Sequence, residues 1–141
     1  MMKSLLSSAI LSGLFCLTAC STGGTPINTE KPFDPNWLQS REWVVEDINK
    51  GGVIDRYHAT LKFDGSNVTG STGCNRFTGS FEVSGNTVTL SPLATTRRAC
   101  APAVMDLEQK FLNALSGPVS VSKDDTGALI LTSASGSILA R

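Results

Sequence analysis

The fold class follows from residues 77–90, which read FTGSFEVSGNTVTL. Phe77, Phe81 and Val83 fall on one face of an extended chain, while Thr, Ser and Glu side chains fall on the other. After the turn-forming pair at 85–86, Val88 and Leu90 alternate with polar residues in the same way. Alternation with a period of two on both sides of a Gly-Asn turn is typical of an antiparallel hairpin with one buried face. The stretch therefore predicts two paired strands.

Six further stretches have the character of short strands and are separated by turn signals rich in Gly, Asn, Asp and Ser. These predicted strands cover residues 42–48, 59–63, 68–73, 119–123, 128–132 and 137–140. The chain shows no internal repeat. Most of the folded part is therefore expected to be antiparallel sheet.

One segment follows a helical period instead. Val104, Leu107, Phe111 and Leu115 recur at intervals of three and four residues, which predicts an amphipathic helix that begins near Pro102. A single helix among so many strands indicates an α+β fold. We expect a mostly antiparallel curled sheet or incomplete barrel of seven to eight short strands, plugged or flanked by this one amphipathic helix.

The N-terminus predicts export rather than structure. Residues 1–19 have a short basic start followed by an uncharged apolar stretch that is too short to span a membrane, and they end in Leu17-Thr18-Ala19-Cys20. That tetrapeptide resembles a bacterial lipobox, which makes Cys20 the expected site of lipidation. An ordinary signal peptide with a chance cysteine is the alternative. Ser21 after the cysteine favours the outer membrane, facing the periplasm.

The predicted organisation is therefore a lipoprotein signal peptide over residues 1–19, a lipidated cysteine and flexible tether over 20–36, and one folded domain over 37–141. The tether is rich in Gly, Thr, Pro and Asn. The expected contact with the membrane is through the lipid anchor alone, and we expect a monomer.

Composition excludes several classes of function. The chain has 12 Lys and Arg against 12 Asp and Glu, so it lacks the basic excess of a nucleic-acid binder. Its single histidine, His58, leaves too few ligands for the usual zinc sites, and no Cys-x-x-Cys pair is present. We expect no nucleic-acid partner, no metal and no cofactor.

Cys74 and Cys100 are the two unlipidated cysteines of the exported chain. Thiols in an oxidising compartment form disulfides, so a Cys74–Cys100 bridge is the default expectation. Closing a loop of about 27 residues would stabilise the fold by roughly 3.5 kcal/mol. The alternative is a reactive Cys74 thiolate activated by His58, which requires a reduced thiol in that compartment.

A bridge between these cysteines would bring Arg76, Arg97 and Arg98 together. Guanidinium groups bind carboxylate or phosphate bidentately, so these arginines, with Asn75 beside them, are candidate residues for binding an anionic envelope ligand or partner. In the alternative interpretation the arginines pair with Glu82, Asp106 or Glu108 or cover the sheet edge, and Asn75 caps a turn.

Two motifs carry a resemblance to a known family. Residues 73–81 read G-C-N-R-F-x-G-x-F, and residues 93–100 read L-A-x-T-R-x-x-C, with the helix following shortly after. Together they resemble the META domain family, which includes HslJ-like bacterial lipoproteins. The resemblance covers residues 37–141. It implies an envelope domain associated with heat response and novobiocin tolerance, and it brings no enzymatic reaction.

We therefore expect a non-enzymatic, lipid-anchored envelope protein that binds or stabilises an envelope component. A small-ligand or lipid-binding cup is the second hypothesis, with a cavity lined by Phe63, Phe77, Phe81 and the helix face. A hydrolase or redox enzyme is the third. No nucleophile–base pair in the sequence supports it.

Overall fold

The computed structural model describes residues 33–141. The predicted signal peptide, Cys20 and the tether up to residue 32 lie outside the described residues. The described elements are, in chain order, α1 (Pro35–Gln39), β1 (Glu42–Ile48), β2 (Ala59–Asp64), β3 (Asn67–Thr72), β4 (Arg76–Ser84), β5 (Thr87–Leu90), β6 (Ala94–Thr95), α2 (Pro102–Ala114), β7 (Pro118–Lys123), β8 (Leu129–Ser133) and β9 (Gly136–Ala140).

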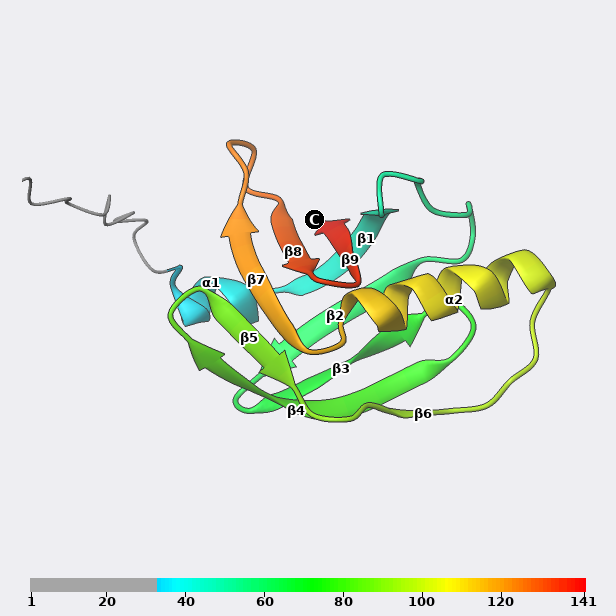
Figure 1. The fold of residues 1–141 in the computed structure, drawn as a ribbon, viewed down its shortest axis with the longest axis horizontal. Helices are drawn as coiled ribbons and strands as arrows, with labels where there is room; N and C mark the ends of the chain where they lie inside the picture. Colours follow the sequence, from blue (N-terminus) through cyan, green and yellow to red (C-terminus); the bar gives the residue numbers. More distant parts are fainter. Residues whose placement is uncertain (1–32) are drawn as a thin grey trace, which may run out of the picture. The chain divides into compact units, whose positions relative to one another are not determined.

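The strands form one antiparallel sheet that closes into a barrel. Their order is β3-β2-β1-β9-β8-β7-β5-β4, and a further pairing of β3 with β4 joins the two ends of this series. β6 pairs only with the first part of β4 and lies outside the closed ring (Figure 1). The predicted α+β class is confirmed, and the curled sheet is a closed barrel of eight strands with one extra strand.

In strand β4 the alternation of apolar and polar residues matches the alternation of buried and exposed side chains. Phe77 and Phe81 are buried while Thr78, Ser80 and Glu82 are exposed, as the alternation predicted. Val83 pairs with Val88 across the predicted hairpin. The first half of β4 pairs with β3 and its second half with β5, so this strand joins the two halves of the barrel.

Helix α1 covers one end of the barrel and was not expected from the sequence. Leu38 on this helix is fully buried, and its carbonyl accepts a hydrogen bond from Trp43 Nε1 at 2.8 Å. Gln39 Oε1 accepts the Gly65 N–H, which ties the helix to the β2–β3 turn. Five residues are too few to show helical periodicity, which is why the helix escaped sequence analysis.

Helix α2 covers the opposite end (Figure 1). Its apolar face buries Val104, Leu107, Phe111 and Ala114, which matches the predicted amphipathic helix. Pro102 is its first residue, and Pro118 begins β7 after the chain leaves the helix. Neither of the two described helices is long and apolar enough to cross a membrane.

Aromatic rings fill the interior of the barrel. Phe63 and Phe81 meet edge to face with ring centroids 5.0 Å apart, and Phe77 contacts Phe111 of α2 at 5.7 Å. All four rings are buried in one core cluster. Phe63, Phe77 and Phe81, which were expected to line a ligand cavity, therefore pack in the core: Phe63 against Phe81, and Phe77 against Phe111 of α2.

Candidate functional site: the disulfide and the arginine edge

The two sequence motifs meet at the end of the barrel that α2 covers. A disulfide joins Cys74, in the β3–β4 turn, to Cys100, just before α2, with the sulfurs 2.08 Å apart. The turn approaches the β1–β2 loop closely, because a Cβ at Gly73 would lie 3.0 Å from the Tyr57 carbonyl oxygen. The φ of Gly73 is +95°, a conformation that favours glycine. The disulfide thus ties the segment before α2 to a tightly packed turn.

Asn75 is the polar centre of this site, with only 3% of its surface exposed. Its Oδ1 accepts hydrogen bonds from the Arg98 N–H at 2.7 Å and from the Thr96 hydroxyl at 3.0 Å. Its Nδ2 donates to the Arg98 carbonyl at 3.3 Å and to Glu108 at 2.9 Å. Every hydrogen-bonding group of the side chain is therefore used inside the protein.

Glu108 connects this centre to α2. Its carboxylate accepts hydrogen bonds from Asn75 Nδ2 and from the Thr72 hydroxyl. The Asn75 N–H in turn donates to Thr72 Oγ1 at 2.9 Å. A half-buried carboxylate is costly unless hydrogen bonds satisfy it, and these bonds do so without a basic partner.

Thr96 aligns the segment after β6 with β4. Its N–H donates to the Arg76 carbonyl at 2.9 Å, and its hydroxyl accepts the Arg76 N–H at 3.0 Å. Together with the Asn75 bonds to Arg98, these contacts fix the backbone of residues 96–98 against the start of β4. The disulfide then fixes Cys100, so both ends of this segment are held.

The three candidate arginines lie on this fixed backbone. Arg76, Arg97 and Arg98 are all exposed, and we call them the arginine edge. Within residues 33–141, the ion pairs are Lys110 with Asp106 and Arg141 with Glu46. None of the three arginines therefore pairs with Glu82, Asp106 or Glu108, the carboxylates proposed from sequence. Their guanidinium groups remain available to an anion.

The remaining candidates for chemistry form no reactive pair, because one of the two is oxidised. His58 is exposed on the β1–β2 loop, and the Cys74 sulfur is in the disulfide. In the described part of the chain, no three His, Cys, Asp or Glu residues come together as metal ligands. With its sulfur in the disulfide, Cys74 has no free thiol to act as a nucleophile.

One carboxylate elsewhere has a perturbed proton affinity. Hydrogen bonds from the Thr126 hydroxyl and the Ala128 N–H lower the pKa of Asp124 below its usual value. Asp124 closes the β7–β8 turn, at the barrel end away from α2. Its role is therefore in that turn.

Sequence analysis missed the roles of Thr72, Thr96 and Glu108. Glu108 was considered as a partner for an arginine and as a helix position that resembles the family, and the two threonines read as ordinary strand and loop residues. The one available signal was the position of Glu108 on α2, a polar residue next to the predicted apolar face. Periodicity does not show which side chain such a residue meets across the fold.

Comparisons with known proteins agree with this architecture. A family model described as "META domain" matches residues 36–141. No curated protein sequence matches the chain. A protein solved by NMR is similar in structure with a TM-score of 0.66 and 28% identity, over 77% of this chain and 94% of that one. A protein from Burkholderia xenovorans, also solved by NMR, has the same fold at a TM-score of 0.56 and 21% identity, over 99% of this chain and 96% of that one.

Proposed function

Because the chain belongs to the META domain family, we propose that it is a non-enzymatic, lipid-anchored protein of the bacterial cell envelope. In this proposal it binds an anionic envelope component through the arginine edge. The observation that carries the proposal is that three exposed arginines, which form no ion pair with any residue from 33 to 141, lie on a backbone held by the disulfide and by Asn75.

A fixed backbone favours binding because less conformational freedom is lost when a partner arrives. Arg98 has its N–H and carbonyl bonded to Asn75, and Arg97 lies between Thr96 and Arg98, both of which are held. Asn75 positions residues 96–98 and does not contact the partner itself, because its side-chain amide is buried and fully hydrogen-bonded. The arginine side chains supply the contact.

The chemistry of the partner follows from the guanidinium groups, which bind carboxylates and phosphates with two parallel hydrogen bonds. The chain as a whole has a net charge of zero, so attraction to anions is local to the edge rather than a property of the whole protein. A single carboxylate or phosphate of an envelope component fits these features, whereas the many phosphates of a nucleic-acid backbone call for a basic excess that the chain lacks.

Anchoring at Cys20 places the domain at a membrane surface. Mass spectrometry of the mature N-terminus should find acyl chains on Cys20, and Cys20→Ala should yield unlipidated precursor. More than one acyl chain is needed, because a single saturated chain gives only marginal membrane binding. An unmodified Cys20 in the exported protein would contradict the anchor without affecting the proposal for the arginine edge.

Site-specific photo-crosslinking tests the recognition surface. A photoreactive residue at Ala99, exposed beside Arg98, should capture a specific partner from envelopes of heat-stressed cells. The same residue at Ser122, exposed on β7 toward the other end of the barrel, is the matched control. Equal capture at both positions would contradict a recognition surface at the arginine edge.

Neutralising the edge should weaken that capture. Arg97→Gln/Arg98→Gln should reduce partner binding at least tenfold, about 1.4 kcal/mol, and leave the thermal midpoint unchanged. Arg41→Gln/Lys62→Gln removes the same charge from the α1 end of the barrel and should bind normally. Tolerance of heat or novobiocin, which we propose depends on this binding, should fall only with the first variant. Loss of stability with unchanged binding would assign Arg97 and Arg98 to the scaffold.

A further inference from the structure

Strand β6 has a free edge. Thr95 is the register partner of Phe77, and the Thr96 N–H donates to the Arg76 carbonyl. In an antiparallel pair this pattern turns the N–H and carbonyl of Thr95 away from β4. Within the described chain, no hydrogen bond reaches the backbone groups of Leu93 or Arg97 on either side. Residues 93, 95 and 97 thus present unpaired backbone groups on one side.

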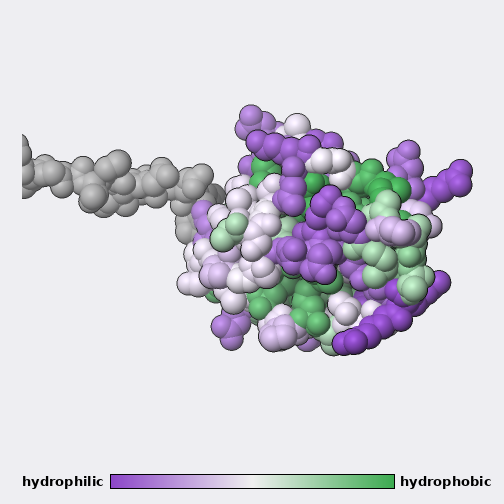
Figure 2. Space-filling view, turned by 45° about the vertical axis from the view of Figure 1, so that its right-hand side comes forward, coloured by the Kyte–Doolittle hydropathy of each residue, from purple (hydrophilic) through white to green (hydrophobic). Residues whose placement is uncertain are grey.

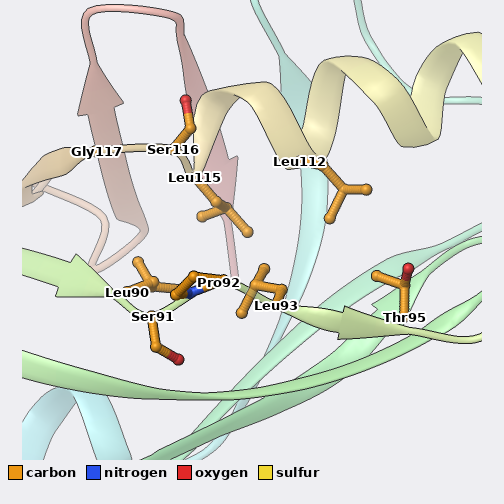
Figure 3. A pocket seen from close by; sticks show the side chains of 9 residues that line it. All are labelled: Leu90, Ser91, Pro92, Leu93, Thr95, Leu112, Leu115, Ser116 and Gly117. Carbon is orange, nitrogen blue, oxygen red and sulfur yellow. The ribbon is translucent and has the colours of Figure 1, made fainter.

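An apolar groove runs alongside this edge. It has a volume of about 370 Å³ and lies between the C-terminal half of α2 and the chain from β5 to β6. Figure 3 shows Leu112 of α2 and Leu115, just after the helix, facing Leu90, Leu93 and Thr95 across it. This volume is at the lower end of the range of ligand pockets. The groove is open to solvent.

The two ends of the groove differ in charge. At the Leu90 end, Glu82 lines a neighbouring hollow that shares Leu90 and Ser91 with the groove. Thr95 lines the groove, and Arg97 lies two residues further along the same extended segment. Glu108, a carboxylate of α2, is already bonded to Asn75 and Thr72. On the face that Figure 2 shows, apolar surface lies in patches separated by polar side chains. An apolar groove with a free cation beyond one end selects for a ligand that is apolar and acidic.

We propose that this groove binds an extended peptide segment of a partner protein. The segment pairs with the free edge of β6, places an apolar side chain between Leu93 and Leu112, and carries an acidic residue next to Arg97. Strand addition of this kind takes its affinity from backbone hydrogen bonds and its specificity from pockets for alternate side chains. The inference rests on the proposed function, because it makes the anionic component a protein.

Edge protection is a second explanation for the shortness of β6. Proteins protect free edges by keeping them short and by placing proline beside them, and Pro92 lies just before β6. Protection alone, however, does not account for an apolar groove next to the edge. A second copy of the chain is the other occupant that an unpaired strand invites, and the experiment below separates it from a partner peptide.

Amide hydrogen exchange tests the edge in the folded domain. In the free protein, the amides of Thr95 and Arg97 should exchange quickly, while those of Thr96 and Arg98, bonded to Arg76 and Asn75, should exchange slowly. Bound peptide should protect Thr95 and Arg97. Slow exchange of these two amides in the free protein at all concentrations would overturn the proposal. Protection that grows with protein concentration would assign the edge to a second copy and would also overturn it.

The peptide probes are an array of seven-residue sequences with Leu, Val or Phe at the centre, Thr and Ser beside it, and Glu, Gln or Lys at one flanking position. We expect the Glu peptides to bind at least fivefold more tightly than matched Gln peptides. Leu112→Glu should abolish binding. Val44→Glu, at an exposed position on the outside of β1, is the matched control and should bind normally. Absence of binding to every peptide would overturn the proposal.

Arg97→Gln separates this inference from the proposed function. It should remove the preference for Glu over Gln peptides while retaining backbone pairing, seen as continued protection of Thr95. If partner capture at Ala99 depends on the arginine edge but Leu112→Glu leaves it intact, the proposed function stands and the groove is not the binding site. If neither change affects capture, both proposals fail.

Discussion

Asn75 pairs with Arg98 as a neighbouring strand would: its Oδ1 accepts the Arg98 N–H at 2.7 Å, and its Nδ2 donates to the Arg98 carbonyl at 3.3 Å. A side-chain amide thus extends the edge of β4 past the end of the regular pairing with β6, whose last paired residue is Thr95. The same Nδ2 reaches Glu108, so one residue joins the sheet, the arginine-bearing segment and α2.

Removing the Asn75 amide should therefore destabilise the domain. Asn75→Ala leaves the Arg98 backbone groups without their partner and the Glu108 carboxylate with only its bond from Thr72, which should lower the free energy of unfolding by about 2–3 kcal/mol. Urea denaturation followed by tryptophan fluorescence measures the change. Thr78→Ala, at an exposed position on the same strand, is the control and should stay within about 0.5 kcal/mol of the parent. An equally small effect at Asn75 would show that water replaces its bonds.

The disulfide should contribute strongly to stability, because it closes a loop with a sequence separation of 26. Cys74→Ser/Cys100→Ser should lower the free energy of unfolding by about 2–5 kcal/mol. Reducing the parent protein should produce the same loss. Non-reducing peptide mapping should recover the two cysteines in one linked fragment. Equal stability of the oxidised and reduced forms would mean that the cysteines serve another purpose.

Gly70 lies where β3 faces the core, and a side chain there has no room. A Cβ at this position would come within 2.0 Å of the Thr60 carbonyl oxygen and 2.8 Å of the Phe77 ring. Gly70→Ala should therefore cost about 2–3 kcal/mol through forced movement of β2 and Phe77. A Cβ at Gly65 would meet nothing within 4 Å, but the φ of Gly65 is +60°. Gly65→Ala should therefore lower the free energy of unfolding by only about 1 kcal/mol. Thermal melting of the two variants distinguishes steric overlap from backbone strain, and equal losses would contradict the register of β3.

The Asp124 turn should make stability depend on pH. Hydrogen bonds from Thr126 and Ala128 lower the pKa of Asp124 in the folded protein, so the carboxylate stabilises the fold above its unfolded pKa. This contribution is lost as the pH falls through the lower, folded pKa. The gap in urea midpoint between the parent and Asp124→Asn should be largest near neutral pH and disappear in acid. Asp125→Asn is the control, since Asp125 accepts no hydrogen bond from residues 33–141. A gap that grows in acid would show that the sign is wrong.

Local patterns of the sequence were sufficient to predict most elements. Alternation identified the β4–β5 hairpin, and the three-to-four spacing of Val104, Leu107 and Phe111 identified α2, because a buried face repeats with the period of its own element. The short elements α1 and β6 escaped, since five and two residues hold too little of any period. The two motifs with their cysteines also indicated the end of the barrel at which the candidate site lies.

The sequence by itself determined which segments are strands and which is the amphipathic helix, because alternation and helical spacing belong to neighbouring residues. Only the tertiary structure decided that β3 pairs with β4 to close the barrel, that Glu108 meets Asn75 across 33 positions of the chain, and that the arginines lack ion pairs within residues 33–141. The physical reason is that these contacts join residues with no common period. From the sequence, Asn75 is a turn-capping or binding residue. Its burial against Glu108 of α2 follows from the tertiary fold, which brings the helix onto the start of β4.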